Sequence, residues 1–311
     1  MTDTLPRRAG RDLPPGRAFE IREERDPHVL ETELADDRSY AAYALGHLEP
    51  GLFEYARYWV ARGPAGSAVV MHATAMGNSV VTVGATEAIA ALLSLHPGAR
   101  AAYVSTAAPE HLRALRRKHQ VSDVLHMMRM TVTASTFAHA AGGEVRRMRG
   151  RDVNRINRLY ATDGGPSHYR YDAIERAVYY GAYDGARLVS VAGTHIVAPN
   201  QSLGIVGNVF TEPGYRGLGL ATRVTSAVTQ ELFERGCGDV TLTVDPSNTP
   251  AVRAYARLGY RRGTPVVEAR LARRDLFGVG PALRRAAARR RAGSPGLEIA
   301  HAPPDLEEDR A

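Results

Sequence analysis

Three glycines stand close together just before an apolar helix pattern, in the segment NVFTEPGYRGLGLATRV at residues 208–224. Gly214, Gly217 and Gly219 each cost roughly 0.5–1 kcal/mol relative to alanine inside a regular element, so something here uses the bare backbone. The first amides of a helix lack intrahelical partners, and the helix dipole stabilises a nearby anion by roughly 0.3–2 kcal/mol. The segment therefore predicts a site where phosphate contacts main-chain amides.

The spacing of these residues narrows the class of phosphate ligand. A dinucleotide fingerprint would carry a third glycine where Thr222 stands, and an acidic residue at the end of the next strand, where Asp239 instead begins it. A Walker loop would carry Gly-Lys-Ser/Thr, which is absent. The amides that a pyrophosphate could reach are those of Gly217, Leu218, Gly219, Leu220, Ala221 and Thr222.

Hydrophobic periodicity predicts the elements that position this loop. In the second half we expect helices at 151–161, 172–178, 216–235 and from Pro250, and strands at 143–150, 178–184, 187–198, 203–211, 239–245 and 264–271. In the first half we expect two short helices within 27–49, helices at 87–96 and 109–118, and strands at 52–61, 67–76, 79–86, 100–106 and 124–132. The short turns before the glycine loop favour antiparallel strands over a doubly wound sheet.

The two halves repeat one order of elements, and residues 101–119 are similar in sequence to residues 240–260. In this alignment Leu115 lies opposite Tyr255. We interpret the chain as two copies of one unit, with two unrelated α/β domains as the alternative.

The second copy resembles the GCN5-related N-acetyltransferases. Val209-Phe210-Thr211 and Pro213 are followed by Arg216-x-x-Gly219-x-Ala221, and Asn248-x-x-Ala251-x-x-x-Tyr255-x-x-x-Gly259-Tyr260 follows downstream, both as in that family's acetyl-CoA signature. The resemblance covers about residues 143–272; for 19–137 it rests on element order. It implies an α/β (α+β) fold of two tandem domains, each a mostly antiparallel twisted sheet flanked by helices, with a splayed parallel strand pair at the coenzyme site.

The resemblance also implies roles for individual residues. The backbone of Val209, Phe210 and Thr211 would contact the pantetheine arm of acetyl-CoA, and residues 216–222, from Arg216 to Thr222, would hold the pyrophosphate. Asn248 would contact the pantetheine or order the following helix. Tyr255 would protonate the departing thiolate, since a phenol of pKa about 10 is protonated at pH 7. The alternative for Tyr255 is core packing, because Val252 and Leu258 share its helix face. The first copy has Leu115 there and no R-x-x-G-x-A, so we expect it to be non-catalytic.

The general base is not specified by a motif. The strand 203–211 carries no acidic residue, and Asn208 cannot accept a proton. His195 on the preceding strand and Asp245 at the end of 239–245 are the titratable candidates. A structural role for His195, and removal of the proton through water, stay open as alternatives, and Glu212 in the loop is expected to cap or to be solvated.

The composition of the chain indicates its domain number, its location and its partners. The 311 residues, 44% hydrophobic and 23% charged, predict two domains, and no apolar run is long enough for a membrane helix. The N-terminus lacks a secretory signal, and the single Cys237 excludes an internal disulfide, so we expect a cytoplasmic protein without a metal. The net charge is +7, and the basic stretch 273–291 lacks interleaved aromatic residues, so we expect a solvated helix face, with contact to nucleic acid or acidic lipid as the alternative.

These expectations divide the chain into a disordered segment 1–18, a degenerate domain 19–137, a catalytic domain 143–272, a basic helical segment 273–292 and a disordered tail 293–311. The leading hypothesis is transfer of an acetyl group from acetyl-CoA to an unidentified primary amine by direct attack in a ternary complex. The alternatives are a non-catalytic acyl-CoA sensor, and a tandem transferase of the kind of mycothiol synthase or the peptidoglycan aminoacyl-ligating proteins. The sequence leaves the oligomeric state open.

Overall fold

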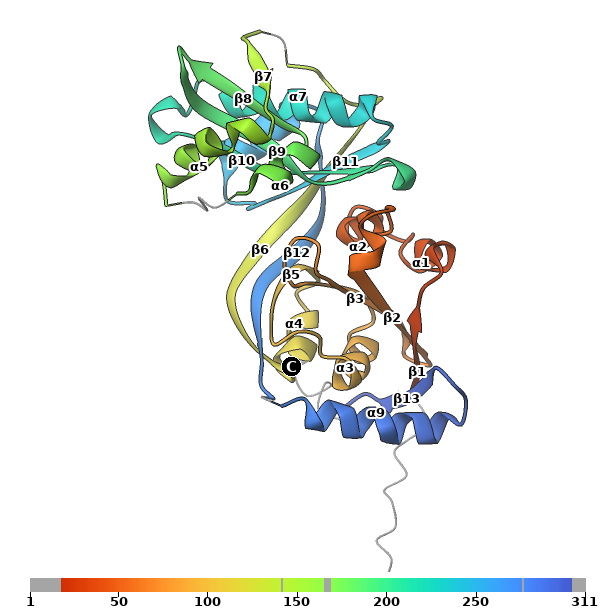
Figure 1. Cartoon of the computed structure of the whole chain (residues 1–311). Coiled ribbons are helices and arrows are strands. Elements are labelled where there is room, and N and C mark those ends of the chain that lie inside the picture. Colours follow the sequence, from red (N-terminus) through yellow and green to blue (C-terminus); the bar gives the residue numbers. More distant parts are fainter. Residues whose placement is uncertain (1–17, 141, 165–168, 276, 304–311) are drawn as a thin grey trace, which may run out of the picture.

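The computed structural model describes residues 18–140, 142–164, 169–275 and 277–303 (Figure 1). The two halves show the same succession of one strand, two helices, three strands, a helix, a strand, a helix and a strand. In the first half these are β1 Ala18–Glu24, α1 Pro27–Glu33, α2 Ala42–Gly46, β2 Ala56–Gly63, β3 Gly66–Ala73, β4 Ser79–Gly84, α3 Thr86–Leu95, β5 Ala101–Ala107, α4 His111–Arg116 and β6 His119–Thr133.

The second half follows with β7 Val145–Arg147, α5 Val153–Ala161, α6 Tyr171–Arg176, β8 Tyr179–Asp184, β9 Arg187–Ala198, β10 Leu203–Thr211, α7 Leu220–Glu234, β11 Asp239–Val244, α8 Thr249–Arg257 and β12 Arg261–Arg273. Two more elements, α9 Val279–Ala292 and β13 Leu297–His301, close the described chain. The repeat predicted from the sequence is confirmed at the level of element order.

All described strands join one sheet in the order β13-β1-β2-β3-β4-β5-β12-β6-β11-β10-β9-β8-β7. Neighbouring strands pair antiparallel except β4 with β5 and β10 with β11, which pair parallel. Each half thus contains one parallel pair inside an antiparallel sheet, which confirms the predicted fold class.

The two halves exchange their last strands. β6 ends the first half but pairs with β11 of the second, while β12 ends the second half and pairs with β5 of the first. β6 and β12 also pair with each other, and Figure 1 shows these two long strands running side by side between the halves. In the sheet, β6 therefore lies beside the strands of the second copy and β12 beside the strands of the first, although each belongs to the other copy by sequence.

Buried apolar clusters lie on both faces of the sheet. In the first half, one cluster lies under α3 and α4 and another under α1 and α2. In the second half, one lies under α7 and α8 and another under α5 and α6. The α1–α2 cluster also takes in Ile196, Ala198, Leu203 and Ile205 of the second half, so apolar packing as well as strand pairing joins the halves.

The C-terminal end is more ordered than the sequence predicts. The expectation of disorder from residue 293 is wrong for residues 297–301, because β13 pairs antiparallel with the outer edge of β1. The buried Glu298 of β13 accepts hydrogen bonds from His96 Nε2 at 2.5 Å and Arg289 Nε at 2.9 Å, which ties the strand to α9. Residues 1–17 and 304–311 lie outside the described residues.

The basic segment forms α9 as expected, and its C-terminal arginines favour a helix end. Within the described residues, no helix combines the length and the apolarity that crossing a membrane requires.

The strand exchange leads to a prediction about the two halves as separate chains. Cutting between β6 and β7 should give fragments that do not fold alone, because β6 loses both of its neighbours, β11 and β12, in the first fragment, and β12 loses both of its neighbours, β5 and β6, in the second. Co-expression should restore a stable complex that co-purifies. The check is the dispersion of amide NMR signals from each fragment alone and from the pair; two well-folded single fragments would contradict it.

Candidate active site

Strands β10 and β11 separate at the end that leads to α7. Their parallel pairing ends at Val206 and Leu242. Residues 207–211 of β10 continue without a partner in β11, while β10 resumes pairing with β9 at Phe210. Main-chain groups along this stretch can therefore hydrogen bond to a ligand instead of a strand. This is where the sequence places Val209, Phe210 and Thr211.

The loop between β10 and α7 leaves the start of the helix open. Gly217 and Gly219 have φ angles of +82° and +73°, which favour glycine, and Gly219 is the N-cap of α7 without a side-chain cap. A Cβ at Gly214, Gly217 or Gly219 would meet no atom within 4 Å. Leu218 between them is 63% exposed. The space beside the loop that precedes this 15-residue helix is thus open, as an anion bound at the first amides requires.

Arg216 holds the loop against the end of β10. Its Nε donates to the carbonyl of Thr211 at 3.2 Å, and Nη2 donates to Asp163 at 2.6 Å. The guanidinium also lies 6.0 Å from the ring centroid of Phe210. The ion pair is about half exposed and adds at most about 1 kcal/mol, so the contacts act mainly by fixing the position of the loop.

Asn208 occupies a bulge beside the separated strands. The pairing of β10 with β9 jumps from Gly207 to Phe210, and Asn208 has a φ of +55°, a conformation in which asparagine is enriched. Its Oδ1 accepts from Tyr169 Oη at 2.9 Å, its Nδ2 donates to Tyr179 Oη at 2.8 Å, and its carbonyl accepts from Tyr160. Three tyrosines therefore fix both the backbone and the amide of Asn208.

His195 lies in a second bulge, on β9. The register passes from Ile196 directly to Thr194, so His195 has no partner in β10 and its side chain is exposed. A Cβ on Gly207 would come within 2.3 Å of its Nε2, so only glycine leaves room for the ring. Although part of this residue is accessible to solvent, the protein packed around the imidazole ring and the charge of Arg129 hold the pKa of His195 below its usual value, and the hydrogen bond with Asn208 opposes this shift.

The two faces of the sheet present different groups at the separated strands. Val206 and Tyr255 share the cluster under α7 and α8, whereas Ile196 beside His195 packs toward α2. Adjacent residues of a strand point to opposite faces, except at a bulge such as that of His195. Tyr255 and His195 therefore lie on opposite faces of the sheet.

Tyr255 is buried in α8, with 7% of its surface exposed. Its ring packs in one cluster with Val224 of α7 and Val244 of β11, at the base of the separated strands. Burial raises the pKa of Tyr255 to about 12, so the phenol is fully protonated at neutral pH. Both predicted roles, proton donor and core residue, are compatible with this position.

The other two predicted residues lie between β11 and α8. Asn248 is the N-cap of α8, and its Oδ1 accepts from the amide of Ala251 at 3.2 Å, which is the helix-ordering role. Asp245 is exposed, and hydrogen bonds from the hydroxyl and amide of Ser247 lower its pKa. A carboxylate stabilised in this way is a weaker base than His195.

Sequence reasoning did not find Tyr43, whose Oη lies 2.5 Å from His195 Nδ1. Tyr43 comes from α2 of the first half, 152 residues away, so no spacing motif could have linked the two. The tyrosines around Asn208 were also missed, because they come from α5, from the segment before α6 and from β8.

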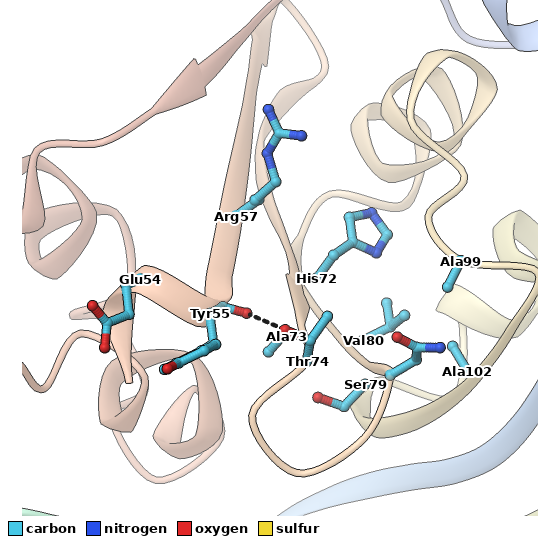
Figure 2. Close-up of a pocket in the computed structure, with 11 residues that line it drawn as sticks. Glu54, Tyr55, Arg57, His72, Ala73, Thr74, Ser79, Val80, Ala99 and Ala102 are labelled. Atoms are coloured by element: carbon cyan, nitrogen blue, oxygen red, sulfur yellow. Dashed lines mark hydrogen bonds between the residues drawn. The ribbon is translucent and has the colours of Figure 1, made fainter. Parts of the chain in front are cut away.

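A separate pocket of about 250 Å³ lies in the first half. Figure 2 shows its lining, which includes Glu54, Tyr55, Arg57 and His72 near the ends of β2 and β3. No residue of the glycine loop or of the predicted catalytic set contributes to it. It is therefore distinct from the site between β10 and β11.

Comparison with protein families gives a match to the second half. Residues 152–260 match the family described as Acetyltransferase (GNAT) family. The matched region contains the glycine loop, His195 and Tyr255.

Comparison with individual proteins gives similar results. A mycothiol acetyltransferase of Catenulispora acidiphila is 34% identical over 88 residues, 27% of this chain and 28% of the relative. One of Actinosynnema mirum is 41% identical over 63 residues, 20% and 21% of the two chains. The matched part thus spans about a quarter of the length of these curated relatives.

Two solved structures share the fold over most of the chain. A GCN5-related N-acetyltransferase of Kribbella flavida superposes with a TM-score of 0.53 at 18% identity, covering 76% of this chain and 96% of its own. A Drosophila protein superposes with a TM-score of 0.54 at 14% identity, covering 79% and 86%.

Proposed function

The C-terminal half of this chain belongs to the acetyltransferase (GNAT) family, and from that premise we propose that the protein moves an acetyl group from acetyl-CoA to a primary amine. The amine attacks the thioester directly while both substrates are bound. The observation that carries the proposal is the open start of α7 next to the stretch 207–211 of β10, which has no partner in β11. Together these offer amides to a diphosphate and main-chain groups to a pantetheine arm.

In this proposal residues 216–222 hold the pyrophosphate, Val209 to Thr211 bind the pantetheine, and Asn248 orders α8. Cys237, the cysteine of the second half, is not suited to form a covalent acetyl-enzyme. The thiol of Cys237 is buried and donates to the carbonyl of Leu203 at 3.3 Å, and burial raises its pKa to about 11, so it is not a reactive thiolate.

Proton transfers are assigned to the two faces of the sheet. Tyr255 donates to the departing thiolate from the face that carries α7. His195 is the preferred base on the other face, since it is exposed, neutral at pH 7 and held next to Asn208, whereas the pKa of Asp245 is lowered. An amine of pKa about 10 is only about 0.1% neutral at pH 7, so such a base contributes directly to the rate.

The first half is proposed to be non-catalytic. Only Ala85 stands between β4 and α3, where the second half has a loop from residue 212 to 219. A Cβ on Gly84 would lie 2.3 Å from the carbonyl of Ser67, and the amide of Ala85 donates to that carbonyl at 2.8 Å, so this turn is bonded to β3. Leu115 is fully buried at the position equivalent to Tyr255 and has no proton to give.

The test combines calorimetric titration with acetyl-CoA and an assay of CoA thiol release over a panel of primary amines. Binding together with amine-dependent thiol release and a mass increase of one acetyl group on the amine is expected. Binding without release on any amine would favour the non-catalytic sensor, and no binding at all would overturn both.

A further inference from the structure

Helix α2 of the first half reaches the acceptor side of the second half. A Cβ on Gly46 would lie 2.8 Å from a side-chain methyl of Ile196, so the helix packs closely on β9. Tyr43 on this helix is buried, and its hydroxyl lies 2.5 Å from Nδ1 of His195. The apolar contacts of α2 with β9 and β10 hold this position.

The hydrogen bonds around Asn208 assign the proton on the His195 ring. Asn208 Oδ1 accepts from Tyr169 and also faces His195, while Nδ2 donates to Tyr179. His195 Nε2, 3.3 Å from that oxygen, therefore carries the hydrogen. Nδ1 then has the free lone pair, and it accepts the hydroxyl hydrogen of Tyr43.

A buried positive charge lies behind this pair. Arg129 on β6 is fully buried, its guanidinium is 4.9 Å from the ring centroid of Tyr43, and none of the ion pairs formed within the described chain includes it. It donates to Thr243 and to Thr106, the latter at 2.5 Å. Its charge opposes protonation of His195 and favours negative charge on Tyr43.

The other titratable groups that influence Tyr43 come from the strands behind it. Glu268 of β12 raises the pKa of Tyr43, and Tyr103 of β5 donates to that carboxylate at 2.5 Å. Burial is the main cause of the raised pKa of Tyr43, and Glu268 adds to it, so Tyr43 is protonated at neutral pH and can give a proton only while it receives another. His195, which is neutral, can take that proton.

We propose that Tyr43 of the first half and His195 of the second form one catalytic proton relay that activates the amine, so that the acceptor side of the site belongs to both halves. The inference rests on the proposed function. The N–H bond of the bound ammonium breaks as its proton moves to the oxygen of Tyr43. The original O–H bond of Tyr43 breaks as that proton moves to His195 Nδ1. Asn208 Oδ1 holds the Nε2–H of the imidazolium, which later releases its extra proton to water.

The test replaces Tyr43 by phenylalanine, which keeps the ring against Arg129 and removes the oxygen. For Tyr43→Phe we expect kcat/KM with an amine to fall about 100-fold, as loss of acid–base catalysis implies, while the Kd for acetyl-CoA stays unchanged. The matched control is Tyr40→Phe, which removes a buried hydroxyl bonded to the carbonyl of Thr82 at 2.9 Å and should leave kcat/KM within about twofold.

A second readout needs no substrate. Nitrogen NMR of the histidine rings in the wild-type protein should show His195 protonated at Nε2, with a pKa below 6.5. In Tyr43→Phe that pKa should rise, because the lost hydroxyl donor had stabilised the neutral ring. In Tyr40→Phe it should not move.

The outcomes separate the two proposals. The relay would be overturned if the neutral His195 ring carries its hydrogen on Nδ1. It would also be overturned if the wild-type enzyme acetylates an amine and Tyr43→Phe is equally active. Either result would leave the acetyltransferase assignment standing. A wild-type protein that acetylates no amine would overturn the proposed function and the relay with it.

Discussion

Replacing Gly219 by arginine is expected to raise the Kd for acetyl-CoA by at least about 100-fold, which corresponds to roughly 2.7 kcal/mol of lost binding free energy. The new side chain would enter the open space in front of the first amides of α7, where we place the pyrophosphate. A Cβ at this position meets no protein atom within 4 Å, so the fold should survive. Calorimetric titration measures the Kd, and thermal unfolding checks the fold.

The control for this variant must carry the same backbone strain. Gly219 has a φ of +73°, in which a residue with a side chain costs roughly 1–2 kcal/mol. Gly293, the C-cap of α9, has a φ of +65° and also has no atom within 4 Å of an added Cβ. Gly293→Arg should lower stability by a similar amount and leave the Kd for acetyl-CoA unchanged. If Gly219→Arg also binds normally, the pyrophosphate lies elsewhere.

The site on the coenzyme side could be predicted from the sequence because its signals are local. Gly217 and Gly219 need positive φ angles, and the helix that follows has a regular apolar stripe, so one short segment specifies the loop. Asn248 likewise caps its own helix three residues ahead. Each of these features depends on neighbours in the chain.

The acceptor side could not be predicted, because its geometry depends on bulges and on distant chain segments. Alternation along β9 would place His195 and Ile196 on opposite faces, and the bulge brings His195 toward α2. The fit also requires Gly207 on the next strand. Tyr43 joins the site only because α2 packs across the boundary between the halves.

The exchange of β6 and β12 escaped prediction for a related reason. The two copies are similar, so each last strand has two equivalent edges to pair with, on β5 and on β11. Local pattern specifies a strand but not which of two similar edges it joins. The short strand β13 was missed because its segment is rich in proline, glycine and acidic residues, and it is stabilised by Glu298 contacts that no local pattern reveals.

Replacing Tyr255 by phenylalanine is expected to lower kcat by about 10²- to 10⁴-fold while the Kd for acetyl-CoA changes little. The ring stays in the apolar cluster that also includes Val224 and Val244, and only the proton donor is lost. With a phenol pKa of about 12, transfer to an isolated thiolate of pKa about 8.5 would be uphill by roughly 5 kcal/mol. The donation therefore requires that the sulfur leave into the same dry space, where burial raises the pKa of the thiolate as well.

The pH dependence and a neighbouring tyrosine make this prediction specific to Tyr255. Its protonated form is the active one, and that form is lost only as the pH rises through about 12, so kcat of the wild-type enzyme should not fall from about pH 8 to 10. The control is Tyr260→Phe, in a ring whose centroid is 6.1 Å from that of Tyr255. It removes a buried hydroxyl that is hydrogen bonded to Thr229 Oγ1 at 2.7 Å, and it should keep kcat within about twofold. Stopped-flow measurement of thiol release on the three proteins decides the question. If Tyr255→Phe releases CoA at the wild-type rate, Tyr255 is a core residue and another group, or water, protonates the sulfur.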